Sequence, residues 1–198
     1  MIGKLAVKPD NPVLPGNSFQ APEGFAESAA PDERGIRAVS GIMIEIIEAN
    51  TDKLIAKAKE LFQEYAESLG FDLCFQDFEQ ELADFPGQYS PPRGRLFLAV
   101  FENHPIGCVA LRDFGRDMCE MKRLYVRPDF RGQRVGRLLA ETVINAANDI
   151  GYDCMRLDTI PSMKSANLLY KCLGFKEIKS YRPNPIEGAL YLELSLTW

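Results

Sequence analysis

The sequence predicts a mixed α/β domain in which a central mixed sheet is flanked by helices on both faces. At 198 residues and 46% hydrophobic composition, the chain is long enough for one domain with a sizeable core. Apolar residues recur at three- and four-residue spacing in some segments and alternate in others. The expected order is strand, two helices, three strands, helix, strand, helix and two strands, which is typical of a mixed sheet covered by helices.

The first 42 residues differ from the rest of the chain. They are rich in proline, contain small residues such as Ala29-Ala30-Pro31 and show little periodicity. We therefore expect residues 1–42 to be a flexible extension, or a segment that is not native to the protein. The first strand pattern begins at Met43, so the folded domain is expected to span residues 43–198.

The first half of this domain predicts one strand and two helices. A strand over residues 43–48 precedes a helix that Asn50 or Thr51 caps and that Gly70 ends. The apolar stripe of this helix has helical spacing and comprises Leu54, Ala58, Leu61, Tyr65 and Leu69. A shorter helix is expected over residues 78–83, and the proline- and glycine-rich residues 85–94 are expected to form a loop.

The second half predicts the rest of the sheet. A hairpin turn at residues 102–105 joins the first two of three consecutive strands. In chain order, the expected elements are strands over 95–101, 106–112 and 118–126, a helix over 132–149, a strand over 155–159, a helix over about 163–173, a strand after Gly174-Phe175, and a strand over 190–196.

Composition excludes several classes of protein. The net charge of −5, from 23 basic and 28 acidic residues, argues against bulk nucleic-acid binding. No apolar stretch approaches the roughly 20 residues of a membrane span, and no secretory signal is visible. The five cysteines are odd in number and include no C-x-x-C pair, which favours reduced thiols. We expect a cytoplasmic protein without a metal site and without a nucleic-acid or membrane partner.

One glycine-bearing segment predicts a phosphate site. Arg131-Gly132-Gln133-Arg134-Val135-Gly136 follows an expected strand and opens an expected helix, so loop N–H groups and the helix dipole both favour an anion there. Between Arg112 and Arg137, lysine and arginine outnumber aspartate and glutamate eight to four. The ligand is therefore expected to be a small phosphorylated molecule.

Three segments together resemble the GCN5-related N-acetyltransferase (GNAT) superfamily, over roughly residues 43–198. The segment from Glu120 to Pro128 resembles the family's fourth strand, and Arg131–Gly136 resembles its acyl-CoA pyrophosphate motif, Q/R-x-x-G-x-G/A. Residues 166–175, ANLLYKCLGF, resemble a third family segment with the pattern A-x-x-x-Y-x-x-x-G-F. The resemblance implies a GNAT-type fold with a central mixed, mostly antiparallel sheet. It also implies acetyl transfer from acetyl-CoA to a primary amine, without a metal.

The resemblance assigns coenzyme binding to the strand end and to the loop. The strand is expected to splay from its neighbour and to bind pantetheine through main-chain groups, and a main-chain N–H near Leu124 is expected to polarise the thioester carbonyl. The assigned residues are Leu124, Tyr125, Val126, Arg131, Gly132, Gln133, Arg134, Val135 and Gly136.

Two positions depart from the family pattern. Arg134 stands where the family usually has glycine, which supplies backbone freedom and close approach to the pyrophosphate. An arginine is tolerable there if its φ stays negative; its guanidinium then either adds a contact to phosphate or crowds the loop. Met163 stands where many members have asparagine, and the asparagine role is not transferred to Asn167.

Two residues are assigned catalytic roles by the resemblance. Tyr170 matches the tyrosine that protonates the departing thiolate; the alternative is a core aromatic residue on the helix face shared with Ala166 and Leu173. Glu120 matches a strand carboxylate that takes the proton of the amine, directly or through water; the alternative is an ion pair with Lys122 or Arg123.

Other residues receive weaker assignments. Because side chains alternate along a strand, Glu120, Lys122, Leu124 and Val126 are expected to share one face. His104, the single histidine, is expected at the surface of a turn, and no cysteine nucleophile is required.

The acceptor amine is left open between a small molecule and a protein. The family binds its acceptor between the early helices and the last strands, here residues 69–94 and 181–188. Arg182 is a candidate for gripping a carboxylate, and Glu187 or Asp84 for gripping an ammonium; each is alternatively a solvated loop charge. A non-catalytic acyl-CoA-binding module is the competing hypothesis, and a homodimer is left open by analogy.

Overall fold

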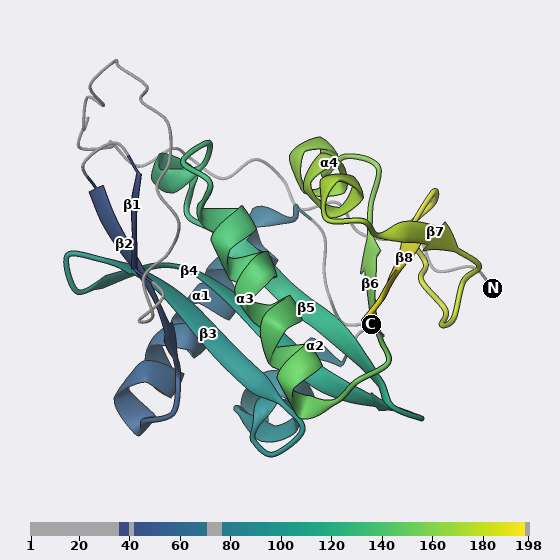
Figure 1. Cartoon of the computed structure of the whole chain (residues 1–198), viewed down its shortest axis with the longest axis horizontal. Helices are drawn as coiled ribbons and strands as arrows, with labels where there is room; N and C mark the ends of the chain where they lie inside the picture. Colours follow the sequence, from purple (N-terminus) through teal and green to yellow (C-terminus); the bar gives the residue numbers. More distant parts are fainter. Residues whose placement is uncertain (1–35, 40–41, 71–76, 197–198) are drawn as a thin grey trace.

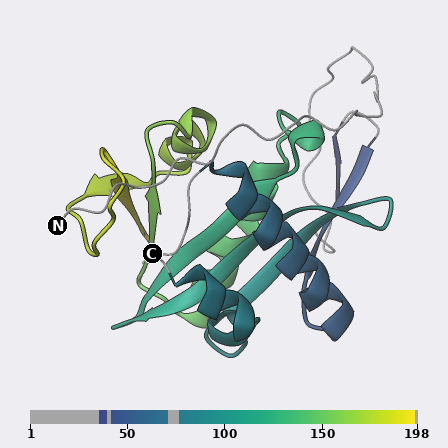
Figure 2. The same ribbon diagram turned by 180° about the vertical axis from the view of Figure 1, so that it is seen from behind.

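The computed structural model describes residues 36–39, 42–70 and 77–196. Its strands form one eight-stranded sheet in the order β1-β2-β3-β4-β5-β6-β8-β7. Neighbouring strands run antiparallel except for β5 and β6, which are parallel. Helices α3 and α4 lie over one face of the sheet (Figure 1), and α1 and α2 cover the other face (Figure 2). The expected mixed, mostly antiparallel sheet flanked by helices is confirmed.

The element bounds follow the sequence pattern closely. The strands are β1 (Ile36–Val39), β2 (Ile42–Glu48), β3 (Arg95–Phe101), β4 (His104–Gly115), β5 (Met118–Val126), β6 (Cys154–Thr159), β7 (Lys176–Ile178) and β8 (Leu190–Ser195). The helices are α1 (Asp52–Ser68), α2 (Phe78–Ala83), α3 (Val135–Ile150) and α4 (Lys164–Cys172). Within the described residues, the connections also contain the short 3₁₀ turns η2 (Gly87–Tyr89) and η3 (Pro128–Phe130).

The sheet begins earlier than expected. β1 pairs antiparallel with β2 through the register Ile36↔Glu45 to Val39↔Ile42, so the structure extends the sheet into the segment that was expected to be an extension. A strand of four residues is enough to cover the edge of β2. The sequence gives little sign of so short a strand, because proline-rich residues precede it. The boundary expected at Met43 therefore differs from the structure. Residues 1–35 lie outside the described residues, and their assignment stays a prediction.

Two apolar cores pack against the sheet. Helix α1 begins at its cap, where the Thr51 hydroxyl accepts a hydrogen bond from the Leu54 N–H at 3.4 Å. Its stripe buries Ala58, Leu61 and Phe62 against one face. On the other face, α3 buries an apolar stripe that comprises Val135, Leu138, Leu139, Ala140, Val143 and Ala147. The sheet is thereby fixed on both sides, which holds β5 in place between α1 and α3.

A β-bulge interrupts β5. Along the β4–β5 ladder Ala110 pairs with Lys122 and Cys108 pairs with Tyr125, so two steps on β4 correspond to three steps on β5. Within the extra step, Arg123 adopts φ 55°, in the left-handed region. One inserted residue reverses the alternation of side chains beyond it.

The bulge corrects the expected arrangement of side chains on β5. Before it, Met121 packs into the core on the α3 side; after it, Leu124 and Val126 pack against that same core. Strict alternation would have put Met121 on the opposite face from both. The expectation that Glu120 and Lys122 share a face with Leu124 and Val126 is therefore wrong, because alternation does not allow for an inserted residue.

Candidate active site

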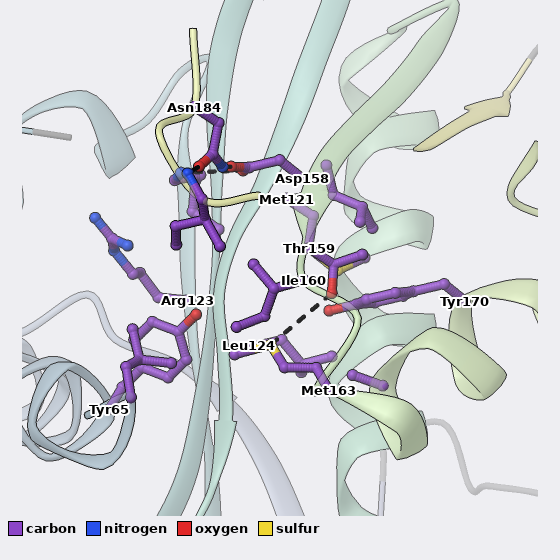
Figure 3. A pocket seen from close by; sticks show the side chains of 15 residues that line it. Tyr65, Met121, Arg123, Leu124, Asp158, Thr159, Ile160, Met163, Tyr170 and Asn184 are labelled. Carbon is purple, nitrogen blue, oxygen red and sulfur yellow. Dashed lines mark hydrogen bonds and ion pairs between the residues drawn. The ribbon is translucent and has the colours of Figure 1, made fainter. Parts of the chain in front are cut away.

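The sheet opens between its two parallel strands. β5 and β6 pair only where Met118–Glu120 face Cys154–Arg156, and beyond this point the strands diverge. A pocket occupies the gap, lined by Leu124 from β5 and by Leu157 and Thr159 from β6 (Figure 3). The splay that was expected at Leu124–Val126 is thus present in the structure.

Two tyrosine hydroxyls enter this pocket from opposite sides (Figure 3). Tyr170, from α4, is 7% exposed, and among the described residues its hydroxyl makes no hydrogen bond. Burial raises the pKa of Tyr170, with smaller contributions from Tyr65 and Asp158, so the phenol stays protonated at neutral pH. A protonated phenol that faces a cavity is able to donate its proton to a ligand there.

Tyr65 was expected only as part of the buried stripe of α1. Its hydroxyl instead reaches the pocket opposite Tyr170, while its ring packs at 6.0 Å, centroid to centroid, against Tyr125 of β5. Burial raises the pKa of Tyr65 to about 12, and the Arg123 charge counteracts this only in part. Spacing alone cannot separate a core tyrosine from one whose hydroxyl lines a site, because both occupy the same helix face.

A groove continues from the pocket toward the start of α3. It has a volume of about 450 Å³ and is lined on one side by Leu124, Tyr125, Val126 and Arg131. The connection between β6 and α4 and the first turns of α4 supply the other side. The strand residues and the first loop residue that were assigned to the coenzyme therefore lie along one continuous groove.

The loop residues present a row of free main-chain donors. The N–H groups of residues 132–136 donate to no acceptor within the described part of the chain, whereas those of Arg137 and Leu138 donate to the Arg134 carbonyl at 3.0 Å each. These free N–H groups lie at the positive end of α3. A row of such amides at a helix N-terminus is suited to an anion with several oxygens.

Arg134 does not keep the negative φ on which its tolerance was expected to depend. Its φ is 61° and its ψ is 5°, the left-handed conformation in which glycine is favoured. The side chain is exposed at the N-terminus of α3. A residue with a Cβ costs about 1 kcal/mol in this conformation, and glycine avoids this cost.

The other arginines of this region have protein partners. Arg127 forms an ion pair with Glu64 at 2.6 Å, and Arg137 forms one with Glu141 at 2.7 Å. The Nε of Arg131 donates to the Val126 carbonyl at 2.9 Å. The cluster predicted from the sequence is therefore partly a set of local contacts that order the strand end and the helix start.

Glu120 is buried behind the pocket and does not line it. The carboxylate is 0% exposed and accepts hydrogen bonds from Arg112 Nε at 2.7 Å and from the Tyr181 hydroxyl at 2.7 Å. A second ion pair joins it to Arg182 at 3.2 Å. Glu120 therefore forms ion pairs, as in the alternative interpretation. Its partners are Arg112 from β4 and Arg182 from the β7–β8 connection, whereas the sequence had suggested Lys122 or Arg123.

Asp158 and Lys122 take the position at the pocket that had been expected for Glu120. Their side chains are 7% and 6% exposed and lie 3.7 Å apart, Oδ1 to Nζ. Asp158 also pairs with Arg182 and accepts a hydrogen bond from Asn184 at 3.1 Å (Figure 3). Burial opposes ionisation, but Lys122 and Arg182 outweigh it and lower the pKa of Asp158. The sequence signal that could have identified this site is Asp158 itself, an aspartate within the apolar strand pattern of β6.

The remaining sequence assignments fall into structural roles. Asn167 accepts a hydrogen bond from Thr159 at 2.8 Å and donates to the Ile160 carbonyl at 3.0 Å, so it ties α4 to the end of β6. Met163 lines the pocket and accepts a long contact from Thr159 at 3.8 Å. Burial raises the pKa of Cys119, the opposite of what a nucleophile needs. His104 is exposed, as expected, but it is the first residue of β4, directly after the turn of residues 102–103.

Comparison with known proteins agrees with this geometry. The sequence profile of the Acetyltransferase (GNAT) family matches residues 55–175. An uncharacterized N-acetyltransferase of Schizosaccharomyces pombe is 43% identical over 141 residues, which cover 70% of this chain and 86% of that protein. One from Dictyostelium discoideum is 30% identical, covering 78% of this chain and 100% of that protein.

Solved structures share the fold. A GNAT-family acetyltransferase from Staphylococcus aureus superposes with a TM-score of 0.66 at 22% identity, covering 78% of this chain and 99% of that one. The family whose profile matches consists of acetyltransferases, which take the transferred group from an acyl carrier. The chain belongs to the GNAT acetyltransferase family, and its relatives are N-acetyltransferases. No helix within the described residues is long and apolar enough to span a bilayer.

Proposed function

We propose that the protein transfers an acetyl group from acetyl-CoA to a primary amine by direct attack. The pantetheine arm lies along Leu124–Val126 in the groove, and the amides of residues 132–136 hold the pyrophosphate. The observation that carries the proposal is Tyr170: its hydroxyl faces the pocket at Leu124 and makes no hydrogen bond within the described residues, and burial raises its pKa.

In this proposal the thioester lies at the Leu124 end of the pocket, and the acceptor amine enters from the Asp158 end. The neutral amine attacks the thioester carbon, the C–N bond forms, the C–S bond breaks, and Tyr170 gives its proton to the departing thiolate. A lysine-like amine is neutral in only about one of 2,500 molecules at pH 7, so the rate rises with pH until the amine is neutral. The amine proton leaves to solvent, and a proton from solvent restores Tyr170.

Glu120 is proposed as a positioning residue. The Glu120 carboxylate could take the proton of the amine only if Arg112, Tyr181 or Arg182 stopped donating to one of the carboxylate oxygens. Its fixed charge instead holds Arg182 and Tyr181 in place beside Asp158, at the acceptor end of the pocket.

Thiol release from acetyl-CoA with a panel of amines tests the function. Tyr170→Phe should lower kcat about 10²- to 10⁴-fold and leave the Kd for acetyl-CoA unchanged. Tyr152→Phe is the matched control, because that hydroxyl donates to the Arg93 carbonyl at 2.8 Å, away from the site, and its loss should leave kcat within about twofold. Coenzyme binding without thiol release for every amine would favour the non-catalytic module.

A cytoplasmic location is part of the proposal. The four cysteines among the described residues, which are Cys108, Cys119, Cys154 and Cys172, are free thiols. Unpaired thiols of this number are typical of a reducing compartment.

A further inference from the structure

A second cavity opens beside the pocket, on the side of the sheet that carries α2. It has a volume of about 270 Å³, and its walls include Arg112, Lys122, Arg123 and Arg182 together with Glu81. Lys122 and Arg123 also line the pocket that holds Tyr170. The two cavities therefore share a wall, and a molecule bound in the second one lies next to the thioester end of the first.

The charged groups around this cavity are paired in a definite way. Glu81 forms an ion pair with Arg123 at 2.5 Å, Oε2 to Nη2, and Asp158 forms ion pairs with Lys122 and Arg182. Behind these pairs, Glu120 forms ion pairs with Arg112, at 2.6 Å, and with Arg182. Within the described residues, four cations thus surround three buried carboxylates, and Asp77 adds a fourth carboxylate only at the exposed rim.

The arginines have hydrogen-bonding capacity beyond these pairs. A guanidinium carries five N–H donors, and Arg182 places its two terminal nitrogens on Glu120 and Asp158, with its Nε donating to no acceptor among the described residues. Arg112 uses its third nitrogen on the side chain of Gln88, an exposed residue, at 2.7 Å. Gln88 lines an adjoining cavity to which Arg112 also contributes, so a carboxylate at the junction of the two cavities could displace this amide from Arg112 and leave the buried pairs intact.

We propose that the amine acceptor also bears a carboxylate, as an amino acid does, and that Arg112 and Arg182 bind this carboxylate in the second cavity. The inference rests on the proposed function, because it names the acceptor class of that same site. The first pocket is lined by both Lys122 and Leu124 and occupies the gap between β5 and β6, which gives the amine of such a molecule a path from the second cavity to the thioester. The sequence had left Arg182 open between this role and a solvated loop charge; its side chain is 18% exposed and enclosed by carboxylates.

The electrostatics of the cluster favour an anionic group over a cationic one. Burial lowers the pKa of Lys122 to about 8, with Glu120 and Asp158 acting against the shift and Arg123 and Arg182 adding to it. A bound carboxylate would lie among four cations whose buried carboxylate partners, in the described part of the chain, number three, whereas the distal ammonium groups of a polyamine would add to these cations.

The test compares matched acceptors in the thiol-release assay with the full chain. Glycine, aspartate and glutamate are each compared with their α-carboxamides and with their decarboxylated amines, and spermidine and a short peptide with a free N-terminus complete the panel. We expect kcat/KM for at least one acid to exceed that for both of its analogues by about 100-fold or more, because a site built to bind a charged group discriminates strongly against its absence.

Charge-conserving variants separate binding from folding. Arg182→Lys and Arg112→Lys keep the charge of the cluster but lose guanidinium donors, so each should lower kcat/KM for the acid at least about tenfold more than it lowers kcat/KM for the carboxamide. Arg93→Lys, in an exposed ion pair with Asp113 at 3.5 Å, is the matched control and should change neither.

The outcomes are distinguishable. Equal or better turnover of the carboxamides, of the decarboxylated amines, of spermidine or of the peptide overturns the carboxylate inference and leaves acetyl transfer intact. An equal loss of acid and carboxamide activity in the lysine variants also overturns it, since a structural role alone produces that pattern. Acetyl-CoA binding without thiol release for any amine instead removes the proposed function on which the inference rests.

Discussion

Removal of the Glu81 carboxylate should strongly destabilise the fold around the β5 bulge. Glu81, from α2, accepts hydrogen bonds from Arg123 Nε at 3.1 Å and Nη2 at 2.5 Å, and a third from the Tyr89 hydroxyl at 2.6 Å. The side chains of Arg123 and Glu81 are only 2% and 5% exposed. Because Arg123 is the inserted residue of the bulge, this ion pair joins α2 to the point where β5 reverses its side-chain alternation.

The magnitude follows from burial. Breaking a buried ion pair by removing one partner costs about 3–5 kcal/mol, a large fraction of the roughly 5–15 kcal/mol that stabilises a typical domain. For a chain of this size, each kcal/mol lowers Tm by about 2–4 °C, so Glu81→Ala should lower Tm by about 6–20 °C. The measurements are the denaturant midpoint and Tm of the two proteins, each followed by circular dichroism.

The control is an ion pair of the same chemistry at the surface. Glu60 pairs with Lys57 at 2.9 Å, and the two side chains are 50% and 43% exposed. Glu60→Ala should therefore change the free energy of unfolding by no more than about 0.5 kcal/mol. If Glu81→Ala proves as mild as Glu60→Ala, the claim that this pair holds the bulge is refuted.

Three further outcomes follow from single residues. Arg134→Gly should leave the free energy of unfolding within about 0.5 kcal/mol, because relief of left-handed strain offsets the added chain entropy, and should weaken acetyl-CoA binding about 3- to 10-fold at low salt; calorimetry that found tighter binding would contradict this. The pKa values of Glu81 and Asp158 are lowered by their cationic partners, so their stabilisation is present above about pH 4 and lost as pH falls through the lowered values; a denaturant midpoint that stayed constant from pH 5 to pH 2 would contradict it. Because the pKa of Lys122 is about 8, its charge disappears as pH rises, and the Ki of succinate as a competitive inhibitor should increase about tenfold between pH 7 and pH 9.5; a constant Ki would show that Lys122 does not sense the anion.

Most of the fold could be predicted from periodicity and turn chemistry. The stripe of α1, the run of β5 and the glycine-bearing start of α3 are local patterns, and the bounds of these elements agree with expectation within a few residues. The pairing of β1 with β2 could not be predicted, because four residues after a proline-rich segment carry too little periodicity.

The site was predictable only where a local motif defines it. The loop before α3 and Tyr170 lie in such motifs; Tyr170 lines the pocket between β5 and β6, and Arg131, the first residue of the loop, lines the groove that continues from it. The bulge at Arg123 could not be predicted, since nothing in an arginine marks a left-handed backbone. The contact of Arg182 with Asp158 depends on two segments 24 residues apart in the chain, and only the folded sheet brings them together.

The divergence of β5 from β6 leaves an edge inside the sheet. An outer edge strand can pair with any other chain that meets it, which is why proteins shorten or cover such strands. This inner edge is different, because α1 lies on one side of it and α3 and α4 lie on the other, so a second sheet cannot approach (Figures 1 and 2). Under the proposed function, the pantetheine arm, which has amide groups of its own, would pair with this open edge. The helices that stabilise the fold therefore also shield the open edge from a second sheet.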